Sequence, residues 1–175
     1  TILQNRHPNW RIKIFDAYRP NEVQQFMVDY AFATLIRDRN LNLEQLSPQQ
    51  QQDIWEDVYQ FWAIPSNDPK TPPPHSTGAA IDITLVDADG ITLDMGGEID
   101  EIGERSHPNY YANSTSDLEQ IYHQRRELLR EVMITAGFCR HPQEWWHFSL
   151  GDQMWVWQKQ QHNADFPAIA CYGRV

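Results

Sequence analysis

Apolar and polar residues alternate along some stretches of this chain and recur at helical spacing along others. Residues 11–15 alternate and are rich in β-branched side chains, which predicts a strand that lies in the core. A second strand is predicted at residues 80–86. The turn at residues 87–90 predicts that residues 91–94 form its hairpin partner. Further strands are predicted at residues 145–150 and 154–158.

Three other stretches carry apolar residues at the spacing of an amphipathic helix. One helix is predicted from Asn21, as its capping residue, to about residue 39. A second is predicted from the capping residue Ser47, with Pro48 at its first position and Gln50 at its third, to about residue 62. A third is predicted over residues 116–137. The apolar face of the first helix is expected to consist of Val23, Phe26, Met27, Tyr30 and Thr34.

Two long stretches show neither the alternation of a strand nor the apolar spacing of a helix. Residues 65–74 are rich in proline, and residues 95–114 are rich in glycine, asparagine and charge. A structureless stretch as long as the second is usually functional in a compact domain. Helices and short strands do not alternate regularly, and the hairpin implies antiparallel pairing. The pattern therefore predicts an α+β fold, with one domain over residues 1–175 whose helices pack on one side of a small central antiparallel sheet.

Composition narrows the classes of function. The chain has 175 residues, which suits one domain with a substantial core, and its hydrophobic fraction of 41% argues against disorder. The formal net charge of -10 argues against nucleic acid as a partner, because phosphate binding needs a basic face. No apolar run approaches the ~20 residues that span a bilayer, so we expect no membrane span.

The candidate chemistry lies in two short segments, His-Ser-Thr-Gly-Ala-Ala-Ile-Asp at residues 75–82 and Glu-Trp-Trp-His at residues 144–147. Asp82 falls in the middle of a predicted strand between isoleucines, where a carboxylate is costly unless it is paired or metal-bound. Gly78 permits a tight turn before this strand, so that His75 can fold back toward Asp82. Taken alone, this segment is also consistent with an exposed or capping aspartate and an unrelated loop histidine.

His147 begins the next predicted strand and can point to the same face as Asp82. With His75 these residues make up the ligand set of an open zinc site, with one zinc per chain and a fourth position for water. Glu144 is then the candidate general base that removes the proton of that water. Strict alternation would aim Glu144 at the opposite face, so the turn at residues 142–144 must be non-extended. The alternative for His147 is a core histidine bonded to the backbone.

Several other polar residues are further candidates for the site. Arg19 follows the first predicted strand, which Pro20 prevents from continuing, and a guanidinium there could bind an oxyanion, a substrate carboxylate or a neighbouring acid. His107 lies in the long loop and could contact the substrate or the backbone. The remaining histidines have no convergent partners in the sequence and are expected to be ordinary surface or helix residues: His7, His123, His141 and His162.

The segments described above, taken in their order along the chain, resemble those of a known enzyme family. Tyr-Arg-Pro at residues 18–20, the spaced His, Gly, Ala and Asp of residues 75–82, and Glu-x-Trp-His at residues 144–147 resemble the zinc-dependent D-alanyl-D-alanine dipeptidases of the vancomycin-resistance type. That family is related to zinc D,D-carboxypeptidases of peptidoglycan. Met-Gly-Gly-Glu-Ile-Asp at residues 95–100 and Glu-Arg-Ser-His at residues 104–107 resemble segments of the narrower dipeptidase family.

The resemblance implies roles for particular residues. It implies that the zinc ligands are His75, Asp82 and His147, that Glu144 is the general base, and that Arg19 stabilises the tetrahedral intermediate. Asp100 matches the position at which the family binds the free amino group of the dipeptide. A carboxylate there would recognise an ammonium and reject blocked or longer chains. Further substrate contact is expected from His107.

The chain also departs from the family pattern. Pro73 stands where the family usually has a serine two residues before the first histidine, so a hydroxyl contact to the substrate is lost. Ile99 replaces an aromatic residue beside Asp100. The family carries several dozen residues before the Arg19 strand that are not present here, and the sequence is therefore expected to lack the family's N-terminal segment.

The prediction is a zinc metallopeptidase that hydrolyses free D-Ala-D-Ala, with the cytoplasm as the expected compartment and export as the alternative. A D,D-carboxypeptidase or L,D-endopeptidase acting on peptidoglycan stems would share the zinc chemistry, but an enzyme for long peptides should not cap the amine side as Asp100 does. An inactive zinc-containing binding module is the alternative from another class. The presence of Glu144 and Arg19 argues against it.

Overall fold

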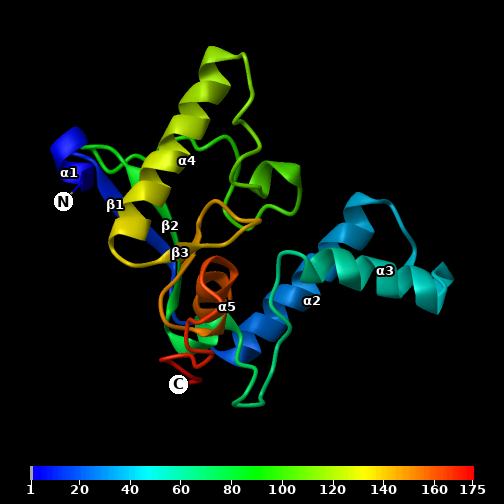
Figure 1. Cartoon of the computed structure of the whole chain (residues 1–175). Coiled ribbons are helices and arrows are strands. Elements are labelled where there is room, and N and C mark those ends of the chain that lie inside the picture. The colour runs from blue at the N-terminus through cyan, green and yellow to red at the C-terminus, as the bar shows by residue number, and fades with distance from the viewer. Residues whose placement is uncertain (1) are drawn as a thin grey trace.

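The computed structural model describes residues 2–175, whose strands form an antiparallel sheet of order β1-β2-β4-β3 (Figure 1). β1 (Arg11–Asp16) pairs with β2 (Ala80–Val86), β2 pairs with β4 (His147–Ser149), and β4 pairs with the short β3 (Cys139–Arg140). Helices accompany this sheet, so the predicted α+β class is confirmed.

The helices fall into two groups around the sheet. α4 (Asp117–Thr135) lies against β2 and β3, whereas α2 (Asn21–Asp38) and α3 (Pro48–Tyr59) pack against each other to one side of it (Figure 1). Short segments complete the set, namely α1 (Ile2–Arg6), α5 (Gln153–His162) and the 3₁₀ helices η1 (Leu43–Gln45), η2 (Pro74–Thr77) and η3 (Glu104–Ser106).

Two hydrophobic clusters correspond to these two groups. One joins the sheet to α4 and includes Ile83, Leu129 and Trp146. The other joins α2 to α3 and includes Val28 and Ile54. Helix packing therefore covers only part of the sheet, and the α2–α3 pair has an apolar interior of its own. The candidate site lies between the two clusters, and residues that adjoin each cluster line it.

Several predicted elements are confirmed in detail. The strand at residues 80–86 coincides with β2, and α3 begins with the predicted capping box, in which Gln50 N–H donates to Ser47 Oγ and Gln50 Oε1 accepts from Ser47 N–H. The strand at residues 11–15 is also present as β1, but the expectation that it lies in the core was wrong. β1 has a partner strand on one side, and its Ile14 and Phe15 are 62% and 57% exposed.

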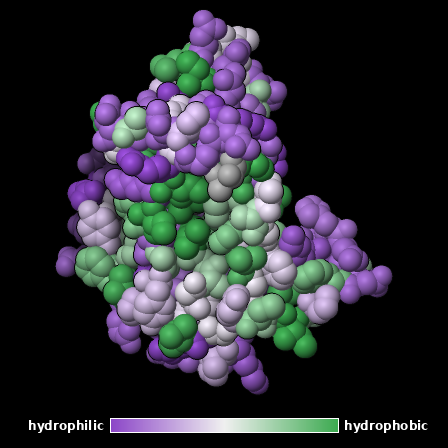
Figure 2. All heavy atoms as spheres, turned by 90° about the vertical axis from the view of Figure 1, so that its left-hand side faces the viewer, coloured by the Kyte–Doolittle hydropathy of each residue, from purple (hydrophilic) through white to green (hydrophobic). Residues whose placement is uncertain are grey.

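β1 lies at an edge of the sheet and carries exposed apolar side chains. Figure 2 views the side of the molecule on which α1 and β1 lie, and apolar side chains gather in the middle of that face with hydrophilic ones around them. Single exposed apolar residues are normal for soluble proteins, whereas a gathered group of them at a sheet edge is less usual.

α2 departs from its prediction in two ways. Its predicted apolar face is largely exposed, and the buried face is instead formed by residues that include Gln24, Val28 and Phe32, because α3 packs against that side. The cap position is Pro20, which makes no side-chain cap hydrogen bond. The predicted cap, Asn21, is the first helical residue, and its Oδ1 accepts the N–H of Ser66 at 2.9 Å, which fixes the proline-rich loop.

Three strand predictions need correction. Residues 154–158 belong to the helix α5, where Asp152 Oδ1 accepts Trp155 N–H at 2.8 Å as an N-cap. The hairpin at residues 91–94 reduces to a single bridge between Val86 and Thr92. The strand at residues 145–150 shortens to β4, because the residues before His147 bend.

Candidate active site

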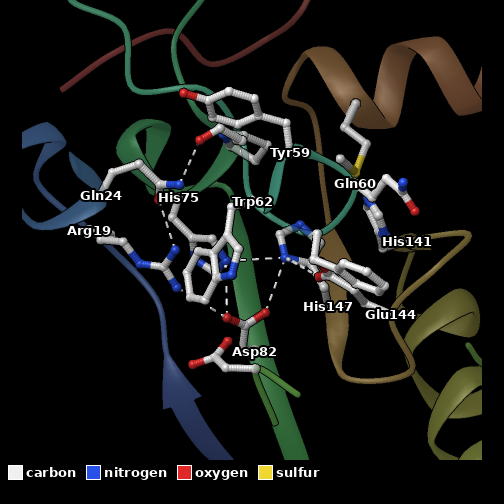
Figure 3. A pocket seen from close by; sticks show the side chains of 15 residues that line it. Arg19, Gln24, Tyr59, Gln60, Trp62, His75, Asp82, His141, Glu144 and His147 are labelled. Carbon is white, nitrogen blue, oxygen red and sulfur yellow. Dashed lines mark hydrogen bonds and ion pairs between the residues drawn. The ribbon is translucent and has the colours of Figure 1, made fainter. Parts of the chain in front are cut away.

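Three buried side chains converge from neighbouring elements, as Figure 3 shows. His75 comes from η2, Asp82 from β2 and His147 from β4, and their candidate ligand atoms all lie within 4.8 Å of one another. Asp82 and His147 are direct cross-strand partners, so both side chains project from the same face of the sheet. Asp82 Oδ2 lies 3.2 Å from His75 Nε2, and Asp82 Oδ1 lies 3.1 Å from His147 Nδ1.

The outer contacts of the two histidines suit metal binding. His75 Nδ1 lies 2.8 Å from the carbonyl oxygen of Ala17, and a carbonyl can only accept, so Nδ1 carries a proton and Nε2 is the nitrogen that faces Asp82. His147 Nε2 lies 3.3 Å from the hydroxyl of Ser149, and Nδ1 is the nitrogen that faces Asp82. Two imidazoles held in this way, each with its inner nitrogen beside a carboxylate, match the donor set of a zinc site.

Local backbone geometry brings His75 to this position. η2 ends at Gly78, which has a φ of 70°, in the left-handed region that glycine enters without steric cost. Arg19 N–H donates to the carbonyl of His75 at 3.2 Å, and Ser76 Oγ donates to the carbonyl of Arg19 at 2.8 Å. The exit from β1 and the turn before β2 therefore hold each other in place.

Arg19 lies buried beside the cluster, with several partners for its guanidinium. Nε donates to Asp16 Oδ2 and Nη1 donates to Gln24 Oε1, each at 2.8 Å, while Nη2 is 3.4 Å from Asp82 Oδ2. The guanidinium also lies over the ring of Trp62, 5.3 Å from its centroid. The expected ion pair with an acid is thus present, and it fixes the cation at the edge of the cluster.

Glu144 reaches the same centre because the chain bends before β4. Its Oε2 is 3.8 Å from His147 Nδ1, and its side chain is buried. Burial and the negative charges of Asp82 and Asp100 raise the pKa of Glu144 well above its ordinary value. Burial alone would also raise the pKa of Asp82, but hydrogen bonds with His147 and His75 outweigh that effect and hold it below the usual range. The site accordingly favours added positive charge.

A cavity of about 180 Å³ opens beside these residues. Drug-sized ligands occupy pockets of roughly 300–1,000 Å³, so this cavity suits a smaller molecule. The end of α3 and the segment after it form one wall, opposite the candidate ligands His75, Asp82 and His147, which we call the metal-ligand cluster (Figure 3). The lining consists of Arg19, Gln24, Tyr59, Gln60, Phe61, Trp62, Ala63, Pro74, His75, Asp82, Asp100, His141, Glu144, His147 and Met154.

Asp100 and His107, both predicted to bind the substrate, are placed differently. Asp100 lines the cavity and has a φ of 66°, in the left-handed region that non-glycine residues adopt uncommonly. Burial, together with the charge of Asp82, raises the pKa of Asp100 to about 6. His107 is half-buried and does not line the cavity. Its ring packs against Phe61, with the ring centroids 6.2 Å apart.

His141 is a cavity residue that the sequence did not reveal. The prediction of an ordinary surface or helix histidine is wrong for it, because its ring lies 5.5 Å from that of His147 and lines the cavity. Its Nδ1 accepts the N–H of Gln143 at 3.2 Å, and burial lowers its pKa to about 3, so the ring is neutral. His141 reaches the cavity because β3 pairs with β4, which brings His141 alongside His147. Only knowledge of that strand pairing could have identified it.

Comparison with known proteins gives a consistent result. A family model described as D-ala-D-ala dipeptidase matches residues 1–168. A D-alanyl-D-alanine dipeptidase of Synechocystis sp. is 54% identical over 179 residues, which cover 99% of this chain and 72% of the relative. That of Escherichia coli is 36% identical over 140 residues, or 80% of this chain and 55% of the relative. That of Enterococcus faecium is 42% identical over 80 residues, or 45% and 37%.

Within residues 2–175, no helix has both the length and the apolar character that a membrane crossing requires.

Proposed function

The chain belongs to the D-Ala-D-Ala dipeptidase family, and on this premise we propose that it is a zinc metallopeptidase that hydrolyses free D-Ala-D-Ala. The observation that carries the proposal is the convergence of His75, Asp82 and His147 beside Glu144 in a small buried cavity. A substrate of two small residues suits the size of that cavity. The free dipeptide is a cell-wall precursor found inside the cell, so we infer that the protein acts in the cytoplasm.

The proposed metal ligands are His75 Nε2, His147 Nδ1 and a carboxylate oxygen of Asp82. Their orientation supports the assignment, since Ala17 and Ser149 bind the outer nitrogens of the two rings. Zinc bound there would polarise a carbonyl group and lower the pKa of a water molecule to about 7. Three protein ligands that include an aspartate are typical of a catalytic rather than a closed structural site.

Glu144 acts in this proposal as general base and then as general acid. Its carboxylate takes a proton from the attacking water as the water oxygen bonds to the scissile carbonyl carbon. The same proton passes to the amine nitrogen when the carbon–nitrogen bond breaks, so that both alanines leave intact. Burial raises the pKa of Glu144, and a carboxylate of raised pKa takes up a proton more readily than an exposed glutamate.

Arg19 and Asp100 would bind the two charges of the reaction. Arg19 is held at the edge of the cavity by Asp16 and Gln24, where its remaining N–H groups can stabilise the negative charge that develops on the carbonyl oxygen. Asp100 lines the same cavity and would bind the ammonium of the dipeptide. An acetylated or longer substrate lacks a charged amine at that point, so Asp100 would select free dipeptides.

The test is metal-dependent release of D-alanine. The chain is stripped with a chelator, D-Ala-D-Ala is added, and D-alanine is measured before and after stoichiometric zinc is returned. We expect no release from the stripped protein and recovery at about one zinc per chain. Release that persists without metal, or zinc binding without release, would contradict the proposal.

A further inference from the structure

Arg126 on α4 is fully buried, although it carries a charge and does not line the cavity. Its guanidinium lies between two aromatic rings, 4.9 Å from the centroid of Tyr111 and 5.3 Å from that of Trp145. Nε donates to the carbonyl of Met95 at 2.7 Å, and Nη1 donates to the carbonyl of His107 at 3.0 Å. One side chain thus binds both ends of residues 95–107, which we call the Asp100 loop.

The Asp100 loop is tied internally around the residue next to Asp100. Glu101 Oε1 accepts from Arg105 Nε at 2.7 Å, and Glu101 Oε2 accepts the N–H of Glu98 at 3.1 Å. Ser106 Oγ donates to the carbonyl of Glu101. The middle of the loop is thus bound to itself, and the two ends that Arg126 binds are tied to α4.

The same guanidinium touches the segment that carries the proposed base. Trp145 follows Glu144 directly, packs its ring against Arg126, and donates its backbone N–H to the carbonyl of Ser106 at 3.0 Å. Arg126 is therefore in contact with the loop that positions Asp100 and with the segment that positions Glu144. A shift of this side chain would change the distance between the two carboxylates.

A role in stability alone does not explain an arginine here. Arg126 forms no ion pair with a carboxylate in the part of the chain that the structure describes, and its buried Nη2 makes no hydrogen bond there. Burial lowers its pKa to about 10. A buried charge without an ionic partner is costly, and well-packed apolar residues usually stabilise a core as well or better. What an apolar residue could not do is bind both carbonyl groups.

We propose that Arg126 is a positioning residue that fixes the Asp100 loop against the Glu144 segment, and thereby sets the selectivity for a free amine. The selectivity part rests on the function proposed above, whereas the fixing of the loop does not. Arg126 touches neither the cavity nor the proposed metal ligands, so it would act through Asp100 and Glu144.

The first test replaces Arg126 by lysine, with Arg130→Lys as the matched control one turn along α4. Arg130 is paired with Glu127 and, within residues 2–175, makes no hydrogen bond to the loop. Lysine keeps the charge but cannot bind both carbonyls. We expect R126K to exchange the amides of residues 95–107 faster than R130K, at unchanged zinc content. We also expect its KM for D-Ala-D-Ala to rise about tenfold to a hundredfold, the worth of one charge-assisted hydrogen bond, with a smaller change in kcat.

A second variant approaches the contact from the loop and spares the core. A Cβ at Gly97 would lie 3.3 Å from Arg126 Nη2 and 3.0 Å from Glu101 Oε2, so Gly97→Ala should loosen the loop in the same direction. Gly173→Ala is the control, because a Cβ there meets nothing within 4 Å. This variant keeps the test decisive if R126K fails to fold.

The outcomes separate the two proposals. If the wild-type chain fails to cleave D-Ala-D-Ala while R126K and G97A still expose residues 95–107 to exchange, the dipeptidase proposal fails and the positioning of the loop stands. If both variants match their controls in exchange and in KM, and differ only in melting temperature, Arg126 is a purely structural residue and the inference is overturned.

Discussion

The metal-ligand cluster and the Asp100 loop line the same cavity but are held by different means. Asp82 and His147 project from paired strands, and His75 is held by backbone contacts at the start of β2. The Asp100 loop has little regular structure and is held by side chains, chiefly Arg126 and Glu101. The difference suggests a division in which the sheet positions the groups of the reaction and the loop decides which substrate reaches them.

The largest effect is expected at the proposed metal ligands. His147→Ala removes one of the three proposed ligands, so the chain should lose both its zinc and its activity. His162→Ala, in the last turn of α5, is the control and should keep both. Metal analysis after dialysis and D-alanine release measure the two effects. A variant that retains one zinc per chain would exclude His147 as a ligand.

The next effect should separate the metal from proton transfer. Glu144→Ala is expected to lower kcat by roughly a hundredfold to ten-thousandfold, the usual contribution of a general base. Zinc content should stay near one per chain, because Glu144 is not a proposed ligand. The neighbouring Gln143→Ala, which does not line the cavity, should resemble the wild type. Substantial residual activity in E144A would show that the proton goes elsewhere.

A smaller effect of another kind is expected on the loop. Asp100→Asn removes the charge that is proposed to bind the ammonium, so KM for D-Ala-D-Ala should rise about tenfold or more while zinc content and kcat change little. Glu98→Gln is the control, since it neutralises an exposed acid of the same loop. Initial rates over a range of substrate concentrations provide both parameters. A fall in kcat with an unchanged KM would mean that Asp100 serves the reaction rather than recognition.

The smallest effect is expected from the ties within the loop. Glu101→Gln weakens the ion pair with Arg105, whose side chain is 57% exposed. Exposed ion pairs contribute at most about 1 kcal/mol, so KM should rise by less than about fivefold. The same kinetic assay measures this change. A loss as large as that of D100N would imply that the loop depends on Glu101 more than on Arg126.

The sequence carried the parts of the site that local geometry decides. Alternation along residues 80–86 placed Asp82 on one face, and Gly78 explained how His75 turns toward it, because both depend on neighbours along the chain. The sequence also indicates that Glu144 can reach the site only if the chain bends before His147, and the structure has this bend. These patterns identified the metal-ligand cluster, which is the one of the two compared regions that the sheet positions.

The parts that sequence reasoning missed depend on distant contacts. Which face of α2 is buried depends on where α3 packs. Because α2 carries apolar residues on several sides, its sequence alone does not distinguish the face that will be buried from its neighbours. His141 reaches the cavity through the pairing of β3 with β4. Arg126 binds carbonyl groups far away in the chain. No local period signals such contacts.

One measurement tests the division most directly, namely the ratio of kcat/KM for D-Ala-D-Ala to that for N-acetyl-D-Ala-D-Ala with the zinc-loaded chain. A strong preference for the free dipeptide, which D100N largely abolishes while it keeps its zinc, is the predicted result. Equal or faster hydrolysis of the acetylated dipeptide by the wild type would contradict the account, because the Asp100 loop would then not select for a free amine.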